Sequence, residues 1–181
     1  MKSVRKVSIA LATIVVAAML GCTDNAKAPD VEGNIRHALD QAGLNDVSVS
    51  QDRDKGVVKL GGKVKTDDDK GRAESIAKSI AGTEVVSNEI GVRPNGDEGD
   101  ARKVDSDLDS GIGKNLDAML VQHHLKNDVR YDVNNGVVTL KGTVASQDRR
   151  GSVQKLAEQV PNVKQVVNEL EVKHQRATSS R

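Results

Sequence analysis

The residues best suited to chemistry are the histidines and a row of alternating aspartates. The four histidines stand at positions 37, 123, 124 and 174, and they match neither His-Glu-x-x-His nor any other zinc spacing. The row from Asp105 to Asp109 would suit Ca²⁺, but Ser110 replaces the glycine of an EF-hand loop and Leu116 replaces its bidentate glutamate. No serine lies in a Gly-x-Ser-x-Gly motif. We therefore expect no metal site, no cofactor and no enzymatic activity.

The N-terminus has the composition of a secretory signal. Lys2, Arg5 and Lys6 precede an apolar run over residues 7–20, and this run is shorter than the roughly twenty residues that cross a bilayer core. Cys22, the only cysteine in the chain, follows directly after a small residue. In this position it resembles the lipobox cysteine of bacterial lipoproteins, which is diacylated before the signal is cleaved on its amino side.

The resemblance to lipoproteins implies a signal peptide over 1–21, lipid attachment at Cys22 and a tether over 22–30. Because Thr23 follows the cysteine, it also implies sorting to the outer membrane, with the protein facing the periplasm. The alternative is a plain signal peptide cleaved after Ala28, which would leave a soluble periplasmic protein.

The charge of the chain argues against a nucleic-acid partner. The 27 lysines and arginines nearly balance the 26 aspartates and glutamates, whereas nucleic-acid-binding domains carry a clear basic excess. The second half of the chain is more basic than the first, which favours an anionic surface as its partner.

A repeated strand organises the rest of the chain. Gly136-Val-Val-Thr-Leu-Lys-Gly-Thr-Val144 repeats Gly56-Val-Val-Lys-Leu-Gly-Gly-Lys-Val64 at an offset of 80 residues, since 136 − 56 = 80. The same offset carries Val86-Ser-Asn88-Glu-Ile90-Gly-Val92 onto Val166-Val-Asn168-Glu-Leu170-Glu-Val172. The repeat predicts two copies of one small unit.

This pattern of a glycine-opened strand, a helix and an Asn-Glu-apolar strand resembles the BON domain. BON domains are bacterial envelope modules found in osmotically induced periplasmic proteins and outer-membrane lipoproteins. The resemblance implies a BON-like domain over 31–92 and a second over 111–173. The segment 93–110 is rich in Gly, Asp and Pro and is predicted to be a linker, and the tail 174–181 is predicted to be disordered.

Hydrophobic periodicity predicts one element order in both copies: helix, strand, strand, helix, strand. The first two strands form a hairpin whose turn ends at Gly56 or Gly136, and the turn of the first copy is two residues longer. Because a strand-helix-strand step crosses over right-handed, the last two strands should be parallel. We expect an α+β fold with two tandem αββαβ domains, each a three-stranded mixed sheet covered on one face by two helices.

Four residues have predicted structural roles. Thr66 and Ser146 should cap the second helix of each copy. Gly62 and Gly142 lie in phase with the apolar face of their strand and should leave room for a helix to approach closely.

Two further pairs of residues could be taken for active-site groups. Asn88 and Asn168 recur between strand-forming neighbours, so we expect structural hydrogen bonds to a nearby loop or cap rather than catalysis. His123 falls on the buried side of its helix and His124 is its neighbour, so one of them should be packed and the other exposed.

Two surfaces of the second copy could bind anions. Arg149 and Arg150 begin its second helix, where free backbone N–H groups beside two guanidiniums would suit phosphate or carboxylate; a solvated surface pair is the alternative. The second surface is the outer side of the helix over 112–125. Its residues are Lys114, Val121, His124 and Lys126, continued by Arg130.

Together these features predict a non-enzymatic envelope lipoprotein. Its expected partners are the membrane, reached through lipidated Cys22, and anionic phospholipid head groups. The BON resemblance implies a role in envelope integrity or osmotic-stress tolerance. The alternative function is a periplasmic interaction module that docks a secretion, porin or cell-wall protein by strand addition.

Overall fold

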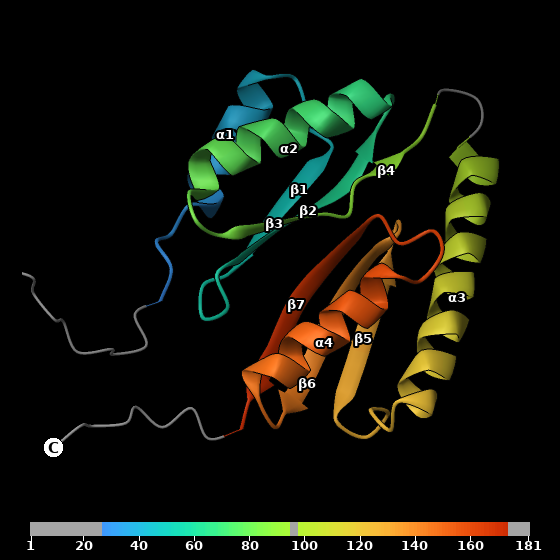
Figure 1. Cartoon of the computed structure of the whole chain (residues 1–181). Helices are drawn as coiled ribbons and strands as arrows, with labels where there is room; N and C mark the ends of the chain where they lie inside the picture. Colours follow the sequence, from blue (N-terminus) through green and yellow to red (C-terminus); the bar gives the residue numbers. More distant parts are fainter. Residues whose placement is uncertain (1–26, 95–97, 174–181) are drawn as a thin grey trace, which may run out of the picture.

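The computed structural model describes residues 27–94 and 98–173, which form two αββαβ units (Figure 1). The first unit contains α1 (Glu32–Gln41), β1 (Val47–Asp52), β2 (Val57–Val64), α2 (Asp67–Ala81), β3 (Val85–Asn88) and β4 (Gly91–Val92). The second contains α3 (Glu98–Gln122), β5 (Val129–Asn134), β6 (Val137–Val144), α4 (Gln147–Glu158) and β7 (Gln165–Val172).

Both sheets have the predicted topology. In each unit the hairpin is antiparallel and the last strand runs parallel to the middle one. The last strand of the first unit is interrupted, and both of its pieces, β3 and β4, pair with β2. The α+β prediction of two mixed sheets is therefore confirmed.

Each unit has its own aliphatic core between the sheet and its two helices. In the second unit Leu116 and Leu120 of α3, Leu140 of β6 and Ala157 of α4 are fully buried. The first unit buries Ile35 and other residues at the corresponding positions. The caps are also as predicted, because the Thr66 and Ser146 side chains accept hydrogen bonds from the third residue on.

The two hairpin turns differ as the sequence predicts. The first turn occupies residues 53–56 and the second only Asn135 and Gly136. Both residues of the short turn have positive φ, 50° and 82°, as a two-residue type I′ turn requires.

The role predicted for Gly62 and Gly142 is wrong. Both have positive φ, and a Cβ at either position would lie 2.1 Å from a backbone carbonyl oxygen, that of Asp46 or Asp128. These carbonyls accept hydrogen bonds from the backbone N–H of Lys63 or Thr143. The absence of a side chain at these glycines therefore leaves room for the loop that precedes the hairpin, not for a helix.

The segment 93–110, predicted to be a linker, is helical from residue 98 onwards. Most of it is helical, because α3 begins at Glu98 and continues without a break into the predicted first helix of the second copy. Asp105 forms an ion pair with Arg93, and Asp109 Oδ2 accepts a hydrogen bond from the Asn135 N–H at 2.8 Å. These contacts fix the helix against both units.

Residues 27–30, predicted to belong to a tether, pack on the first unit. The Ala28 N–H donates to Arg53 O (2.9 Å), and Gln51 Nε2 donates to Pro29 O (2.6 Å). The predicted signal peptide over 1–21, Cys22 and the tail 174–181 lie outside the described residues. Within the described part of the chain, no helix is long and apolar enough to cross a membrane.

The two units meet through the sheet faces that carry no helices. Val57 of the first unit and Val137 and Val167 of the second form a small buried cluster of their own. Gln165 donates from Nε2 to Val86 O (2.7 Å) and accepts at Oε1 from the Asn88 N–H (3.2 Å). Its side-chain amide thereby satisfies two backbone groups of β3, as a neighbouring strand would.

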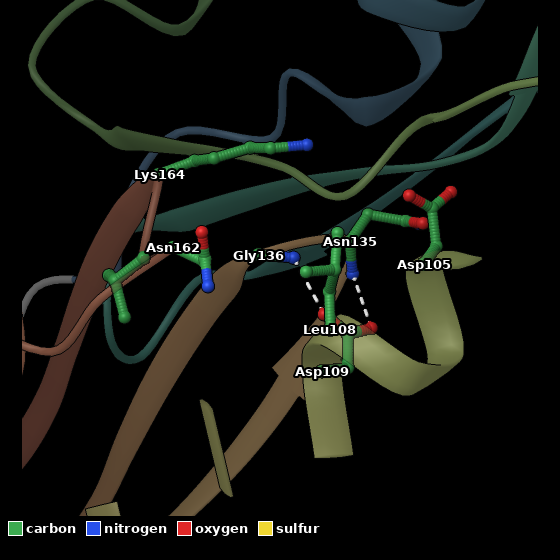
Figure 2. Close-up of a pocket in the computed structure, with 8 residues that line it drawn as sticks. Asp105, Leu108, Asp109, Asn135, Gly136, Asn162 and Lys164 are labelled. Carbon is green, nitrogen blue, oxygen red and sulfur yellow. Dashed lines mark hydrogen bonds between the residues drawn. The ribbon is translucent and has the colours of Figure 1, made fainter. Parts of the chain in front are cut away.

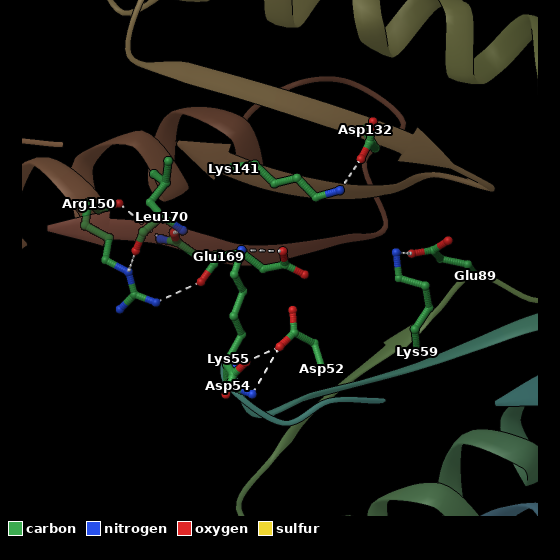
Figure 3. A network of polar contacts seen from close by, with 11 residues as sticks. Asp52, Asp54, Lys55, Lys59, Glu89, Asp132, Lys141, Arg150, Glu169 and Leu170 are labelled. Carbon is green, nitrogen blue, oxygen red and sulfur yellow. Dashed lines mark hydrogen bonds and ion pairs between the residues drawn. The ribbon is translucent and has the colours of Figure 1, made fainter. Parts of the chain in front are cut away.

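Ion pairs line the rest of this contact (Figure 3). Lys55 of the first hairpin turn reaches Glu169 of β7 at 3.3 Å, and Lys59 pairs with Glu89 within the first unit at 3.1 Å. The interface between the units is therefore largely polar, like the interfaces between domains that move relative to each other.

Candidate functional site

The repeated asparagines connect the last strand of each unit to its second helix. Asn168 Nδ2 donates to Arg150 O (3.2 Å) and to Gln154 Oε1 (3.1 Å), and its Oδ1 accepts from the Leu170 N–H (3.2 Å). Asn88 makes the equivalent bonds to α2 and to its own strand. The predicted structural hydrogen bonds are present, but they reach a helix rather than a loop or cap.

Arg150, predicted to bind phosphate, uses its guanidinium within the domain (Figure 3). Nε donates to Leu170 O (3.0 Å) and Nη2 to Asn168 O (2.7 Å). Lys70 occupies the equivalent place in the first unit and donates to Ile90 O (2.7 Å). In both units a cationic side chain thus donates hydrogen bonds to backbone carbonyls at the last strand. Only the guanidinium N–H groups of Arg150 that make no such bond are left for a ligand.

Arg149 lies on the surface at the start of α4. Its backbone N–H donates to Ser146 Oγ (3.2 Å), and its Nη2 donates to His123 O (3.4 Å) at the end of α3. This bond brings together the two surfaces that the sequence suggested separately. Sequence reasoning had no signal for it, because it joins two helices distant in the chain.

Both histidines at the end of α3 are exposed, so the expectation that one of them is packed is wrong. The helix ends at Gln122, and Leu125 enters the core instead, with its N–H donating to Leu120 O (2.7 Å). His124 has a φ of 54°, the left-handed conformation that glycine usually supplies after a helix.

Near its C-terminal end, the outer side of α3 exposes a large apolar side chain beside cations. Val121 is 60% exposed. Lys114 is also exposed on this side. Arg130, predicted to continue the surface, alternates with Val129 and Tyr131 and therefore points to the face of the sheet that carries no helices. Neither cation has an ion-pair partner among residues 27–94 and 98–173. Lys126 is different, because it forms an ion pair with Asp117.

Asp117 also binds Tyr131, which fixes α3 to β5. The Tyr131 hydroxyl oxygen lies 2.8 Å from both Asp117 Oδ1 and Gly113 O, and its one proton is shared between these two acceptors. Hydrogen bonds from Lys126 and then from Tyr131 lower the pKa of Asp117. Burial of the ring, followed by the bond to Asp117, raises the pKa of Tyr131 to about 12.

We expect the second unit to lose stability in alkali because of Tyr131. Its pKa in the folded state, about 12, exceeds the value of about 10 for an unfolded chain. Above pH 10 the unfolded chain ionises first, so stability that is complete below pH 10 falls as the pH rises towards 12, by roughly 2 kcal/mol. Tyr131→Phe should remove this pH dependence.

The measurement is direct because Tyr131 is the only tyrosine and the chain has no tryptophan. Urea unfolding at pH 8 to 11 reports the stability of the domain, and absorbance at the tyrosinate band reports the ionisation of Tyr131 alone. A wild-type tyrosine that titrates near pH 10 in the folded state would contradict the expectation.

In the ranges 27–94 and 98–173, no group of three His, Cys, Asp or Glu side chains could hold an ion. The aspartates of the row 105–109 lie within α3, where Asp105 and Asp109 bind Arg93 and the second hairpin turn.

The fold and the site define a tandem-repeat α+β protein. In each unit an asparagine of the last strand donates hydrogen bonds to the second helix. The chain belongs to the BON domain family, whose model matches residues 28–94 and 105–174. This confirms the resemblance in both copies. The second match begins inside the segment that was predicted to be a linker.

Two relatives span most of the chain. Osmotically-inducible protein Y of Escherichia coli (strain K12) is 28% identical over 146 residues, which are 79% of this chain and 71% of that protein. The uncharacterized protein in the gshII 5' region of Anaplasma centrale is 33% identical over 121 residues, 66% of this chain and 78% of that protein.

Among solved structures, the C-terminal domain of CdsD is similar to this chain. CdsD is a structural protein of the type III secretion system of Chlamydia trachomatis. The match has 16% identity and a TM-score of 0.33, and it covers 79% of this chain and 65% of that one. A likeness at this score carries no conclusion.

Proposed function

We propose that this protein is a bacterial envelope lipoprotein that contacts anionic phospholipid with one end of its second domain. Acylated Cys22 would attach it to the outer membrane, facing the periplasm. Membership of the BON family and the similarity to an osmotically inducible protein support a role in envelope integrity or osmotic-stress tolerance. The role requires no catalysis.

The observation that carries the lipid proposal is the surface at the end of α3. Val121 is the most exposed large apolar side chain in the described chain, and Arg149 is bonded to the same helix end. Lys114 adds charge two turns away on the same helix face, whereas Arg130 points to the helix-free face of the sheet because it alternates with Val129 and Tyr131. Lys126 is compensated by Asp117, and Arg150 is engaged with β7. An apolar side chain among cations suits the interface of an anionic membrane.

The charges favour a weak contact that acts together with an anchor. Each unpaired cation contributes about 1 kcal/mol near an anionic surface, so Arg149 and Lys114 together give only modest affinity. Stable membrane attachment generally needs two signals, such as acyl chains and a basic patch. Cys22 and this surface would supply the two.

Vesicle flotation tests the proposal with a chain that starts at residue 23, so that no acyl chain contributes. The chain should float with phosphatidylglycerol vesicles at low salt, and less at high salt because the charges are screened. Arg149→Glu and Val121→Asp should each weaken binding roughly tenfold, since reversing a charge or burying a new one costs more than about 1.4 kcal/mol.

Arg72→Glu is the matched control, because Arg72 is an exposed arginine of α2 in the first domain. It makes the same change in net charge and should leave flotation intact. Equal loss in Arg72→Glu and Arg149→Glu would contradict a defined surface. If the wild-type chain does not float at all, Cys22 alone would supply membrane contact, and docking to an envelope protein becomes the better account.

A further inference from the structure

A pocket lies where α3 meets the two turns of the second domain (Figure 2). Its volume is about 190 Å³, below the roughly 300–1,000 Å³ of sites for drug-sized ligands, so its occupant must be small. The lining residues are Asp105, Leu108 and Asp109 of α3, Asn135 and Gly136 of the hairpin turn, and Asn162, Val163 and Lys164 before β7.

The helical wall of this pocket exists only in the second domain. The first domain has a ten-residue α1, whereas α3 has 25 residues and extends past the core on its N-terminal side. Asp109 holds this extension in place, since its two carboxylate oxygens accept from the Asn135 and Gly136 N–H groups, both at 2.8 Å. The wall is therefore fixed before any ligand binds, which lowers the cost of binding.

The two carboxylates in the lining already have partners. Asp109 is satisfied by the turn, and Asp105 forms an ion pair with Arg93. The charge of Asp105 is thus compensated by Arg93, whereas Asp109 keeps its charge and has both oxygens occupied by backbone N–H groups. Lys164 is the only cation among the residues that line the pocket, and it has no ion-pair partner in the described part of the chain.

The backbone and stem of Lys164 are positioned by the hairpin turn. Its N–H donates to Gly136 O (2.9 Å), and a Cβ at Gly136 would come within 3.0 Å of Lys164 Cγ and Cδ. In Figure 2 the side chain extends over the turn. Burial, followed by the positive charge of Lys164, lowers the pKa of nearby Lys70, so an anion placed here would relieve the repulsion between two cations.

The remaining walls are apolar. Leu108 is 40% exposed, and Val163 is half-buried at the edge of the second core. A ligand that satisfied both parts of the pocket would place an aliphatic group against Leu108 and Val163 and an acidic group at the ammonium of Lys164.

We propose that this pocket binds a small amphipathic anion, such as a short-chain carboxylate, with its acid at Lys164 and its chain against Leu108 and Val163. The site is separate from the surface at the end of α3, so it does not depend on the proposed contact with phospholipid.

Titration of the ¹⁵N-labelled full chain with hexanoate, followed by NMR, tests this site. Hexanoate should cause saturable shifts centred on the amides of Gly136 and Lys164. Hexanol, which lacks the charge, and acetate, which lacks the chain, should bind more weakly. Lys164→Met keeps the apolar stem over Gly136 and should weaken hexanoate binding roughly tenfold, the loss of one charge-assisted contact.

Leu108→Ser tests the apolar wall and should also weaken binding, with the thermal unfolding midpoint showing that the fold is retained. Lys103→Met is the control, because Lys103 is an exposed lysine of α3 that does not line the pocket; its affinity should equal that of wild type. Failure of hexanoate to saturate at millimolar concentration would overturn the proposal. So would equal affinity in wild type and Lys164→Met.

Discussion

Gly142→Ala is expected to unfold the second domain at room temperature. Gly142 has a φ of +124°, and a Cβ there would lie 2.1 Å from Asp128 O and 3.2 Å from its carbonyl carbon. Both are backbone atoms, and the carbonyl is held by the Thr143 N–H, so neither can move without breaking the start of the hairpin. A clash of this kind on an unfavourable backbone costs more than about 3 kcal/mol.

A small domain cannot absorb that loss. A unit of roughly sixty residues buries only about 60% of its unfolded surface and has correspondingly low stability. Gly62 has the same clash with Asp46 O, at 2.1 Å, so Gly62→Ala should unfold the first domain in the same way. The repeated glycines are therefore required by the loop before each hairpin.

Gly151→Ala is the same chemical change as Gly142→Ala, but we expect it to raise the free energy of unfolding instead of lowering it. Gly151 is in the interior of α4, and an added Cβ would meet nothing within 4 Å. Alanine there should stabilise the domain by about 1 kcal/mol, because glycine in a helix interior loses more entropy on folding. Urea unfolding followed by the fluorescence of Tyr131, which lies in β5, measures both variants. Equal midpoints for Gly142→Ala and wild type would contradict the clash.

The repeat makes much of each domain predictable from the sequence. Val58, Leu60 and Val64 alternate along β2, and the equivalent residues of β6 do the same, so their faces and cores follow from local periodicity alone. The short turn at Asn135 and Gly136 is likewise predictable, because few residues accept positive φ. Local preference and tertiary structure agree at all these positions.

Features that depend on distant contacts were not predictable in this way. The segment 93–110 contains glycine, proline and many aspartates and favours a loop by composition, but Arg93 and the second hairpin turn bind Asp105 and Asp109 and make a helix stable there. Arg150 was assigned to a ligand because it begins a helix. The sequence did contain a signal for its actual role, because the equivalent residue of the first copy, Lys70, is also a cation. A cation repeated at the same position in both copies indicates a structural role for Arg150.

Nothing in the sequence indicated that the two domains dock against each other. We expect Val167→Glu to separate the two domains without unfolding either of them. Val167 is 1% exposed and packs with Val57 and Val137, outside both domain cores. A carboxylate buried there without a partner costs several kcal/mol. Among the residues that the structure describes, the buried apolar cluster at this contact has three members, all of them valines. Separation, which returns the charge to water, therefore costs less than burial.

Small-angle scattering should therefore show a larger radius of gyration for Val167→Glu, while circular dichroism shows unchanged helix and strand content. The Asn88 amide should exchange faster with solvent, because it loses the Gln165 side chain that now accepts its hydrogen bond at 3.2 Å. Val104→Glu is the control: Val104 is 56% exposed on α3, so its carboxylate stays in water and the domains should remain docked. If Val167→Glu instead unfolds the second domain, Val167 contributes to the core of that domain as well as to the contact, and the two units do not fold independently.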